Sequence, residues 1–137
     1  MRLRKITFRY TEVVGGLSRA FEAETWACRR PQPMASPLFR PPADVIETDD
    51  AYLVILELSG VDEEDVEILV HPDALVVFGR RRCQDPPGAR YHAAEIRYGP
   101  FRFDMEMPRD ADADRVEACA DRGLVRIRVA RRTGVNS

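Results

Sequence analysis

The stretch AYLVILELSGVDEEDVEILVHPDALVVFGRR, residues 51–81, decides the fold of this chain. It contains three runs rich in Val, Ile, Leu, Phe and Tyr, which are separated by SGVDEED and HPD. Short runs of β-branched and aromatic residues bounded by Gly, Pro and acidic residues are typical of strands separated by turns. We therefore predict three strands here.

The first run, residues 51–58, is apolar on both faces of a strand. Under the two-residue period of a strand, one face carries Tyr52, Val54, Leu56 and Leu58. Leu53 and Ile55 lie on the other face, so we expect this strand to be covered on both sides over most of its length. A helix would have to end at Gly60 after about two turns, which is shorter than a buried helix usually is.

The connection after the first run is too short for a crossover helix. Asp62 is placed to cap a single turn through its side-chain oxygen, and Glu63, Glu64 and Asp65 add negative charge at the start of that turn. Parallel neighbours need a connection of about a dozen residues or more. The strands therefore belong to antiparallel pairs or to two different sheets.

The rest of the chain adds further strands and one ambiguous segment. Residues 44–48 are a short candidate strand, residues 101–107 alternate as a half-exposed strand, and residues 124–132 alternate as a final strand. Residues 110–122 fit a strand by the alternation of Val116, Ala118 and Ala120, and a helix by their content of Ala and Glu. Six to eight short strands predict an all-β fold, an antiparallel β-sandwich. A helix at residues 110–122, which would give an α+β domain, is the alternative.

Residues 80–88 (RRRCQDPPG) predict a protruding loop, because Pro86 and Pro87 cannot continue a β-ladder. We expect its three adjacent arginines to be solvated. Residues 89–98 (ARYHAAEIRY) fit either a short strand or a turn of helix.

Residues 1–40 form an N-terminal arm and a proline-rich linker before the β-domain, which we place at residues 41–131 and which leaves a short tail at residues 132–137. The apolar spacing from Val13 to Trp26 predicts that the arm is flexible or partly helical. The arm holds too many large apolar residues to stay solvated, so it requires a partner surface. That surface belongs to its own domain, to a sister subunit or to a foreign chain, and the pattern does not choose among them.

Composition and charge narrow the function classes. With a formal net charge of -2 at pH 7, the chain favours neither nucleic acid nor an anionic membrane as a partner. No apolar run approaches the roughly 20 residues of a membrane helix, and the first residues lack a secretory pattern, so we expect a cytoplasmic protein. Cys28, Cys83 and Cys119 are odd in number and widely spaced, which favours free thiols over disulfides or a zinc cluster.

No recognisable catalytic or cofactor motif is present in the sequence. His71 precedes a proline at a predicted strand end, where a surface role is expected. His92 and Cys83 lack the elbow, the oxyanion loop and the orienting third group of a nucleophile pair. We therefore expect no enzymatic activity, no cofactor and no metal site; a thiol enzyme that uses Cys83 is the minor alternative.

Four motifs resemble the α-crystallin domain of small heat-shock proteins of the bacterial type. They are P-x-D-V-x-E-T-D-D at residues 42–50, L-x-G-V-x-x-E-D-V at 58–66, Y-G-x-F at 98–101 and A-x-x-x-x-G-L-V at 118–125. The resemblance covers about residues 41–131. It implies an immunoglobulin-like sandwich and an ATP-independent holdase, which binds partly unfolded proteins and prevents their aggregation.

The resemblance also implies a homodimer formed by strand exchange, in which a short strand on the loop of one subunit pairs with the first strand of its sister. The residues involved would be Asp44, Val45, Ile46, Glu47, Ala89, Arg90, Tyr91 and His92. A groove between two further strands would be lined by Val66, Ile68, Val70, Val116, Ala118 and Ala120. In relatives this groove receives an I-x-I-type motif from a tail, which RRTGVNS lacks here. We therefore predict a dimer or a small oligomer, unless the N-terminal arm substitutes.

A holdase of this type would bind its clients through apolar surface on the arm. The candidate client-binding residues are Phe8, Tyr10, Val14, Leu17, Phe21, Trp26 and Phe39. A further departure from the family is Phe103, which stands where an arginine is usual and puts any ion pair of that arginine in doubt. The alternative function is a non-catalytic sandwich module, similar to co-chaperone domains, whose arm docks on one folded partner.

Overall fold

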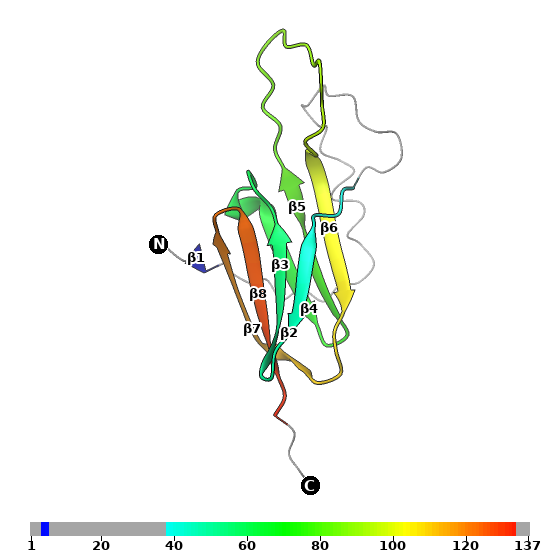
Figure 1. The fold of residues 1–137 in the computed structure, drawn as a ribbon, viewed down its shortest axis with the longest axis vertical. Helices are drawn as coiled ribbons and strands as arrows, with labels where there is room; N and C mark the ends of the chain where they lie inside the picture. The colour runs from blue at the N-terminus through cyan, green and yellow to red at the C-terminus, as the bar shows by residue number, and fades with distance from the viewer. Residues whose placement is uncertain (1–3, 6–37, 134–137) are drawn as a thin grey trace.

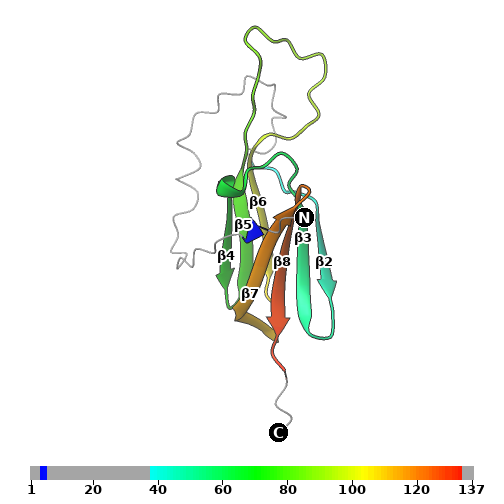
Figure 2. The same cartoon turned by 90° about the vertical axis from the view of Figure 1, so that its left-hand side faces the viewer.

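Two antiparallel β-sheets face each other in the computed structural model, which describes residues 4–5 and 38–133 (Figure 1). The larger sheet has the strand order β1-β7-β8-β3-β2, and the smaller sheet has the order β4-β5-β6. The strands are β1 (Arg4–Lys5), β2 (Ala43–Glu47), β3 (Ala51–Glu57), β4 (Val66–His71), β5 (Ala74–Arg81), β6 (Gly99–Glu106), β7 (Ala111–Asp121) and β8 (Leu124–Arg131). Figure 2 shows the two layers from the side. The predicted β-sandwich is confirmed, whereas the helix predicted between Val13 and Trp26 lies outside the described residues.

The stretch at residues 51–81 forms β3, β4 and β5 as predicted, because its apolar faces turn inward. The side chains of Val54 and Leu56 in β3 and of Leu75 and Val77 in β5 are 0% exposed. β3 pairs with β2 and β8, whereas β4 and β5 pair with each other in the opposite sheet. The stretch therefore contributes strands to both layers and supplies much of the core between them.

The outer face of β3 differs from the prediction. We expected both faces of this strand to be covered, but Leu53 and Ile55 are only half-buried and line a hollow on the outside of the larger sheet. A sheet in a two-layer sandwich packs through one face, so an apolar outer face is available surface. The prediction fails within residues 4–5 and 38–133, because none of these residues forms a second layer over the outer side chains of β3.

The connection between β3 and β4 contains a single 3-10 turn, η1 (Glu63–Asp65). The predicted cap is wrong, because Asp62 precedes this turn but makes no side-chain capping hydrogen bond. Asp65 instead accepts hydrogen bonds from Arg82 Nε at 2.6 Å and Nη2 at 2.8 Å, and from Arg80 Nε at 3.3 Å. The acidic turn is thus fastened to the end of β5 by two charged side chains.

The ambiguous segment at residues 110–122 is a strand. β7 pairs with β8 along its second half and places Ala118, which is 6% exposed, in the core. The two strands are joined by a tight turn in which Arg122 and Gly123 have φ angles of 51° and 80°. Two consecutive residues with positive φ match the twist of a two-residue hairpin. The helical alternative is therefore excluded.

Gly79 lets the turn η1 pack directly against β5. A Cβ atom at this position would lie 1.9 Å from the backbone oxygen of Asp65 and 2.8 Å from the ring of Phe101. No real side chain tolerates such a distance to a backbone atom, so the contact between η1 and β5 requires glycine.

The end of the sandwich opposite the long loop is closed by Tyr52, Asp110 and Arg131. The Tyr52 hydroxyl donates to Asp110 Oδ1 at 2.7 Å, and Arg131 Nε donates to Asp110 Oδ2 at 2.7 Å. Arg131 Nη1 also lies 3.1 Å from Glu47 Oε1. The hydrogen bond from Tyr52, followed by that from Arg131, holds the pKa of Asp110 below its ordinary value. The same contact with Asp110 raises the pKa of Tyr52.

Candidate functional site

β2 is an edge strand of the larger sheet, as a receptor for strand exchange has to be. It is last in the sheet order and pairs with β3 alone among the described strands. All four predicted receptor residues, Asp44 to Glu47, are exposed, with Val45 at 51% and Ile46 at 42%. An edge strand presents backbone donors and acceptors to which a further strand can add. The receptor geometry is suitable, and the exchange itself stays a prediction.

Residues 82–98 connect β5 to β6 and stand away from the sandwich at one end (Figure 2). The predicted exchange residues Ala89, Arg90, Tyr91 and His92 lie in this loop and are exposed, without strand structure. The Ala89 N–H donates to the Pro86 carbonyl at 3.1 Å, and the Tyr91 hydroxyl donates to Asp85. These residues therefore add no strand to either sheet of their own chain.

The base of this loop is held by Arg81, which sequence reasoning missed. We expected the three adjacent arginines to be solvated, but the Arg81 side chain is buried, at 8% exposure. Its Nε donates to the Ser59 carbonyl at 2.9 Å and its Nη1 donates to the Arg97 carbonyl at 2.8 Å. The expectation fails because Arg81 lies on the inner side of β5, where its guanidinium bonds to backbone carbonyls. It also stands 5.2 Å from the ring centre of Phe39.

The groove predicted between β4 and β7 is brought together by the fold, and it is largely closed. Val66, Ile68 and Ala118 are buried, while Val70, Val116 and Ala120 are half-buried and pack against the same core. A hollow of about 170 Å³ remains at one end, where Val66 and Ala120 meet the turns on either side. Side chains of β4 and β7 thus share one core, and the groove as a binding site stays a prediction.

The outer edge of β7 is paired by residues close to the N-terminus. Arg4 of β1 lies opposite Ala120, and Lys5 lies opposite Cys119, in antiparallel register. The sequence left open whether the arm meets its own domain, a sister subunit or a foreign chain. For these two residues the structure favours the chain's own domain, and the edge that borders the groove is thereby covered at this point.

Phe39 was wrongly grouped with the client-binding residues. It is 7% exposed, its N–H donates to the Pro100 carbonyl at 3.1 Å, and its carbonyl accepts from the Arg102 N–H at 3.0 Å. Its ring lies 5.7 Å from that of Phe101. A phenylalanine at the end of a proline-rich linker is indistinguishable by sequence from an arm residue. The other six candidates, at positions 8, 10, 14, 17, 21 and 26, lie outside the described residues.

Phe103, at the position where the family usually has an arginine, is a core residue. It is 1% exposed in β6, and the Arg40 guanidinium lies 4.6 Å from its ring centre. Its neighbour Arg102 is exposed on the opposite face of β6, as expected. The side chain at position 103 therefore packs and forms no ion pair.

The described residues carry little that suggests catalysis. His71 accepts a hydrogen bond on Nδ1 from the Asp73 N–H at 3.2 Å, a local turn contact, and His92 is exposed in the loop. Cys83 is disulfide-bonded and Cys119 is a free cysteine, so the expectation of free thiols fails for Cys83, and no thiol is present there to serve as a nucleophile. Among residues 4–5 and 38–133, no group of three His, Cys, Asp or Glu side chains is placed to hold a metal ion. The same residues include no helix that is long and apolar enough to span a membrane.

Comparisons with known proteins agree with this geometry. The chain is similar to spore protein SP21 of Stigmatella aurantiaca, with 32% identity over 111 residues that cover 80% of this chain and 64% of SP21. It is also 32% identical, over 91 residues, to a 17.6 kDa class II heat shock protein of Arabidopsis thaliana, covering 64% of this chain and 59% of that protein. The matched region thus spans about three-fifths of each relative.

Solved structures show the same fold. A small heat-shock protein from Xylella fastidiosa matches with a TM-score of 0.66 and 25% identity, over 72% of this chain and 92% of that one. The hspA protein of Xanthomonas axonopodis matches with a TM-score of 0.63 and 27% identity, over 69% of this chain and 95% of that one. Residues 44–137 match the Hsp20/alpha crystallin family. This chain therefore belongs to the Hsp20/alpha crystallin family.

Proposed function

We propose that this protein is an ATP-independent holdase chaperone, which binds partly unfolded proteins and prevents their aggregation. The observation that carries the proposal is the match of residues 44–137 to the Hsp20/alpha crystallin family, together with relatives that are named as heat shock proteins.

Apolar surface is the physical basis of client binding in this proposal. An unfolding protein exposes apolar side chains, and each Å² removed from water contributes about 25 cal/mol. The arm supplies six of the candidate client-binding side chains within its first 26 residues, at positions 8, 10, 14, 17, 21 and 26. The described residues add exposed apolar side chains at Val45 and Ile46 of the edge strand. Because such surfaces are not shaped for one partner, we expect a broad range of clients.

The assembly unit in this proposal is a homodimer, formed when Ala89 to His92 of one subunit pair with Asp44 to Glu47 of the other. Three observations support it: β2 is an edge strand, its residues Asp44 to Glu47 are exposed, and the loop residues make no strand of their own. We place the protein in the cytoplasm, with no cofactor and with neither nucleic acid nor membrane as a partner. Residues 132–137 contain no I-x-I motif, so we propose no groove contact from this segment.

The proposal is tested by the light scattering of a client that aggregates on heating, in the absence of nucleotide. We expect the full chain to suppress scattering at substoichiometric amounts, and the double variant Phe21→Ser, Trp26→Ser to lose most of that suppression. Ile96→Ser, which removes an apolar side chain from the loop instead, is the matched control and should retain it. If the full chain protects none of several unrelated clients, the holdase proposal is wrong and the single-partner interaction module takes its place.

A further inference from the structure

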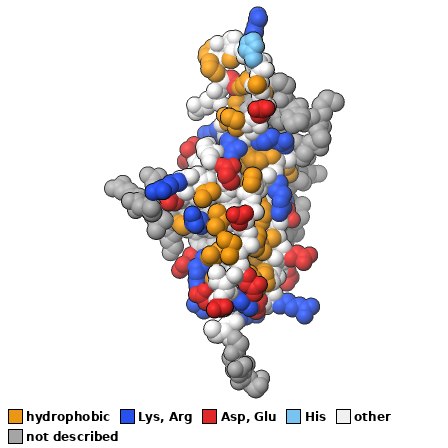
Figure 3. All heavy atoms as spheres, in the orientation of Figure 1, with side chains coloured by type: hydrophobic (Ala, Val, Ile, Leu, Met, Phe, Trp, Pro, Cys, Tyr) orange, Lys and Arg blue, Asp and Glu red, His pale blue; other side chains and the backbone are white. Residues whose placement is uncertain are grey.

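The outer face of the larger sheet carries side chains in an ordered pattern across three strands. The cross-strand register aligns Asp44 of β2, Ile55 of β3 and Arg126 of β8 in one row. The next row aligns Ile46, Leu53 and Arg128. The first row therefore reads acid, apolar, base from one side of β3 to the other. Figure 3 views the molecule from this side and shows apolar side chains interspersed with acidic and basic ones.

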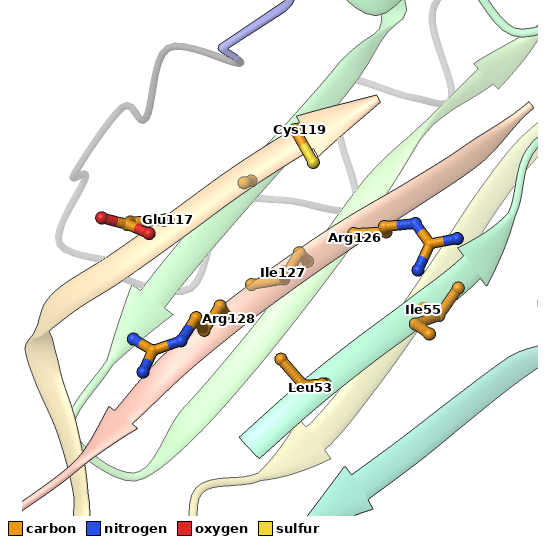
Figure 4. A pocket seen from close by; sticks show the side chains of 8 residues that line it. Leu53, Ile55, Glu117, Cys119, Arg126, Ile127 and Arg128 are labelled. Carbon is orange, nitrogen blue, oxygen red and sulfur yellow. The ribbon is translucent and has the colours of Figure 1, made fainter. Parts of the chain in front are cut away.

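The face has a hollow on one side of β3 and an exposed apolar side chain on the other. A hollow of about 440 Å³ lies over β8, where its rim includes Leu53 and Ile55 of β3, Arg126 and Arg128 of β8, and Cys119 of β7 (Figure 4). On the opposite side of β3, Ile46 of the edge strand is 42% exposed. The exposed side chain of Ile46 and the hollow over β8 thus lie on opposite sides of β3.

The charges at the two ends of the first row have no partner within the described part of the chain. Asp44 and Arg126 are both exposed, and neither side chain makes a hydrogen bond or an ion pair with a described residue. Arg128 differs, because its Nη2 lies 2.9 Å from Asp50 Oδ2. One acid and one base are therefore left to bind a group from another molecule.

We propose that this face binds the same face of a second copy of the chain, about a two-fold axis that runs along β3. Such a rotation exchanges the strands on either side of the axis, so that β8 of one copy lies over β2 of the other. Arg126 then faces the partner's Asp44, and Asp44 faces the partner's Arg126. Ile46 of each copy enters the hollow over β8 of the other, while Leu53 and Ile55 meet their own counterparts on the axis.

The spacing of strands and sheets agrees with this arrangement. Neighbouring strands lie about 4.8 Å apart, so Asp44 and Arg126 stand at nearly equal distances on either side of β3, as a two-fold axis requires. Sheets that pack face to face lie about 10 Å apart, within reach of an arginine and an aspartate that extend toward each other. Isologous contacts of this kind need a surface that complements itself, and the acid-apolar-base row does so.

This contact goes beyond the proposed holdase and is separate from strand exchange. Exchange uses the backbone edge of β2, whereas the face contact uses side chains that point away from the sheet. The two contacts together join two exchanged dimers, which gives an assembly of four or more subunits without any tail motif. The hollow is then part of an interface and not a site for a foreign peptide.

Charge reversal in the full chain tests the proposal. We expect Asp44→Arg and Arg126→Asp each to weaken association at least about tenfold, because like charges across an interface cost more than an exposed ion pair contributes. The double variant Asp44→Arg, Arg126→Asp restores opposite charges across the axis and should recover the mass of the wild type. Sedimentation velocity over a range of concentrations measures the masses. Arg109→Asp and Glu106→Arg, which make the same changes at exposed positions away from the face, should leave them unchanged.

Several outcomes would overturn the inference. Single variants with the mass of the wild type, or a double variant no better than the singles, would show that Asp44 and Arg126 do not meet. Leu53→Glu provides a second variant, checked for folding by circular dichroism, and should reduce the mass in the same way. If it leaves the mass unchanged and instead speeds proteolysis of residues 6–37, the face holds the chain's own arm and not a second copy.

Discussion

The sandwich and the loop at residues 82–98 are held by different kinds of contact. Within the sandwich, the inner strands β3, β5, β7 and β8 pair on both sides, and fourteen hydrophobic core residues are under 5% exposed, among them Val54, Leu56 and Phe101. The loop has exposed apolar side chains at Tyr91 and Ile96, and it is fastened mainly at its base by Arg81 and Arg82. The sandwich is thus held by contacts within its own chain, whereas the loop exposes apolar side chains that another chain can contact. Substitutions should therefore cost less stability as they move from the core of the sandwich toward the loop.

The largest effect is expected at Gly79. Gly79→Ala places a Cβ 1.9 Å from the backbone oxygen of Asp65, so β5 and η1 have to separate. We expect a loss of about 3 kcal/mol or more of unfolding free energy, measured by urea denaturation. The control is Gly88→Ala in the loop, where nothing lies within 4 Å of the added Cβ. Because Gly88 has a positive φ, alanine at this position should still cost about 1 kcal/mol of unfolding free energy. Equal losses of unfolding free energy at both positions would contradict the difference between the sandwich and the loop.

The second-largest loss of stability is expected for a substitution at Arg81, which lies where the sandwich meets the loop. Arg81→Met keeps the length of the side chain but removes donors from the carbonyls of Ser59 and Arg97. Removing the hydrogen bonds that a charged guanidinium donates to these carbonyls costs about 2 kcal/mol of unfolding free energy. Arg90→Met in the exposed part of the loop is the matched change and should cost less than about 0.5 kcal/mol. A loss for Arg81→Met as small as that for Arg90→Met would show that the base of the loop is not fixed by this residue.

A smaller and pH-dependent effect is expected for Tyr52→Phe, which removes the hydrogen bond to Asp110. Since that bond lowers the pKa of Asp110 in the folded state, it contributes stability above the pKa of the unfolded state. This contribution is lost as the pH falls through the folded pKa of Asp110. We therefore expect the variant to be less stable than the wild type near pH 7, and the two denaturation midpoints to converge in acid. A constant difference across the pH range would contradict this role for Asp110.

The smallest effect on stability is expected in the loop itself. The double variant Arg90→Pro, His92→Pro removes two backbone donors from the predicted exchange strand. The unfolding free energy of the monomer should change by less than about 0.5 kcal/mol, because neither residue belongs to a strand of its own chain. The dimer should nevertheless dissociate at higher protein concentration, which analytical ultracentrifugation detects. A lower monomer stability with unchanged dimerisation would reverse the assignment of this segment.

The β-strands could be predicted from the sequence because period-two alternation reports directly which face is buried. Residues 51–81 and 101–107 follow this rule, and even the ambiguous residues 110–122 follow it once Ala118 faces the core. The burial of Arg81 and Phe39 could not be predicted, since both depend on tertiary neighbours that no local pattern encodes. The outer-face row of Asp44, Ile55 and Arg126 was equally hidden, because β8, which supplies Arg126, lies far from β2 and β3 in the sequence.

The central claim is that a stable sandwich associates through segments that its own fold leaves unpaired. Hydrogen exchange of the full chain at two protein concentrations tests this claim most directly. The account predicts slow exchange in β3, β5 and β8 at both concentrations. It also predicts that the amides of residues 89–92 and of the outer edge of β2 are protected when the protein is concentrated, and lose that protection on dilution. Fast exchange at residues 89–92 at every concentration, or protection there that survives in the monomer, would contradict it.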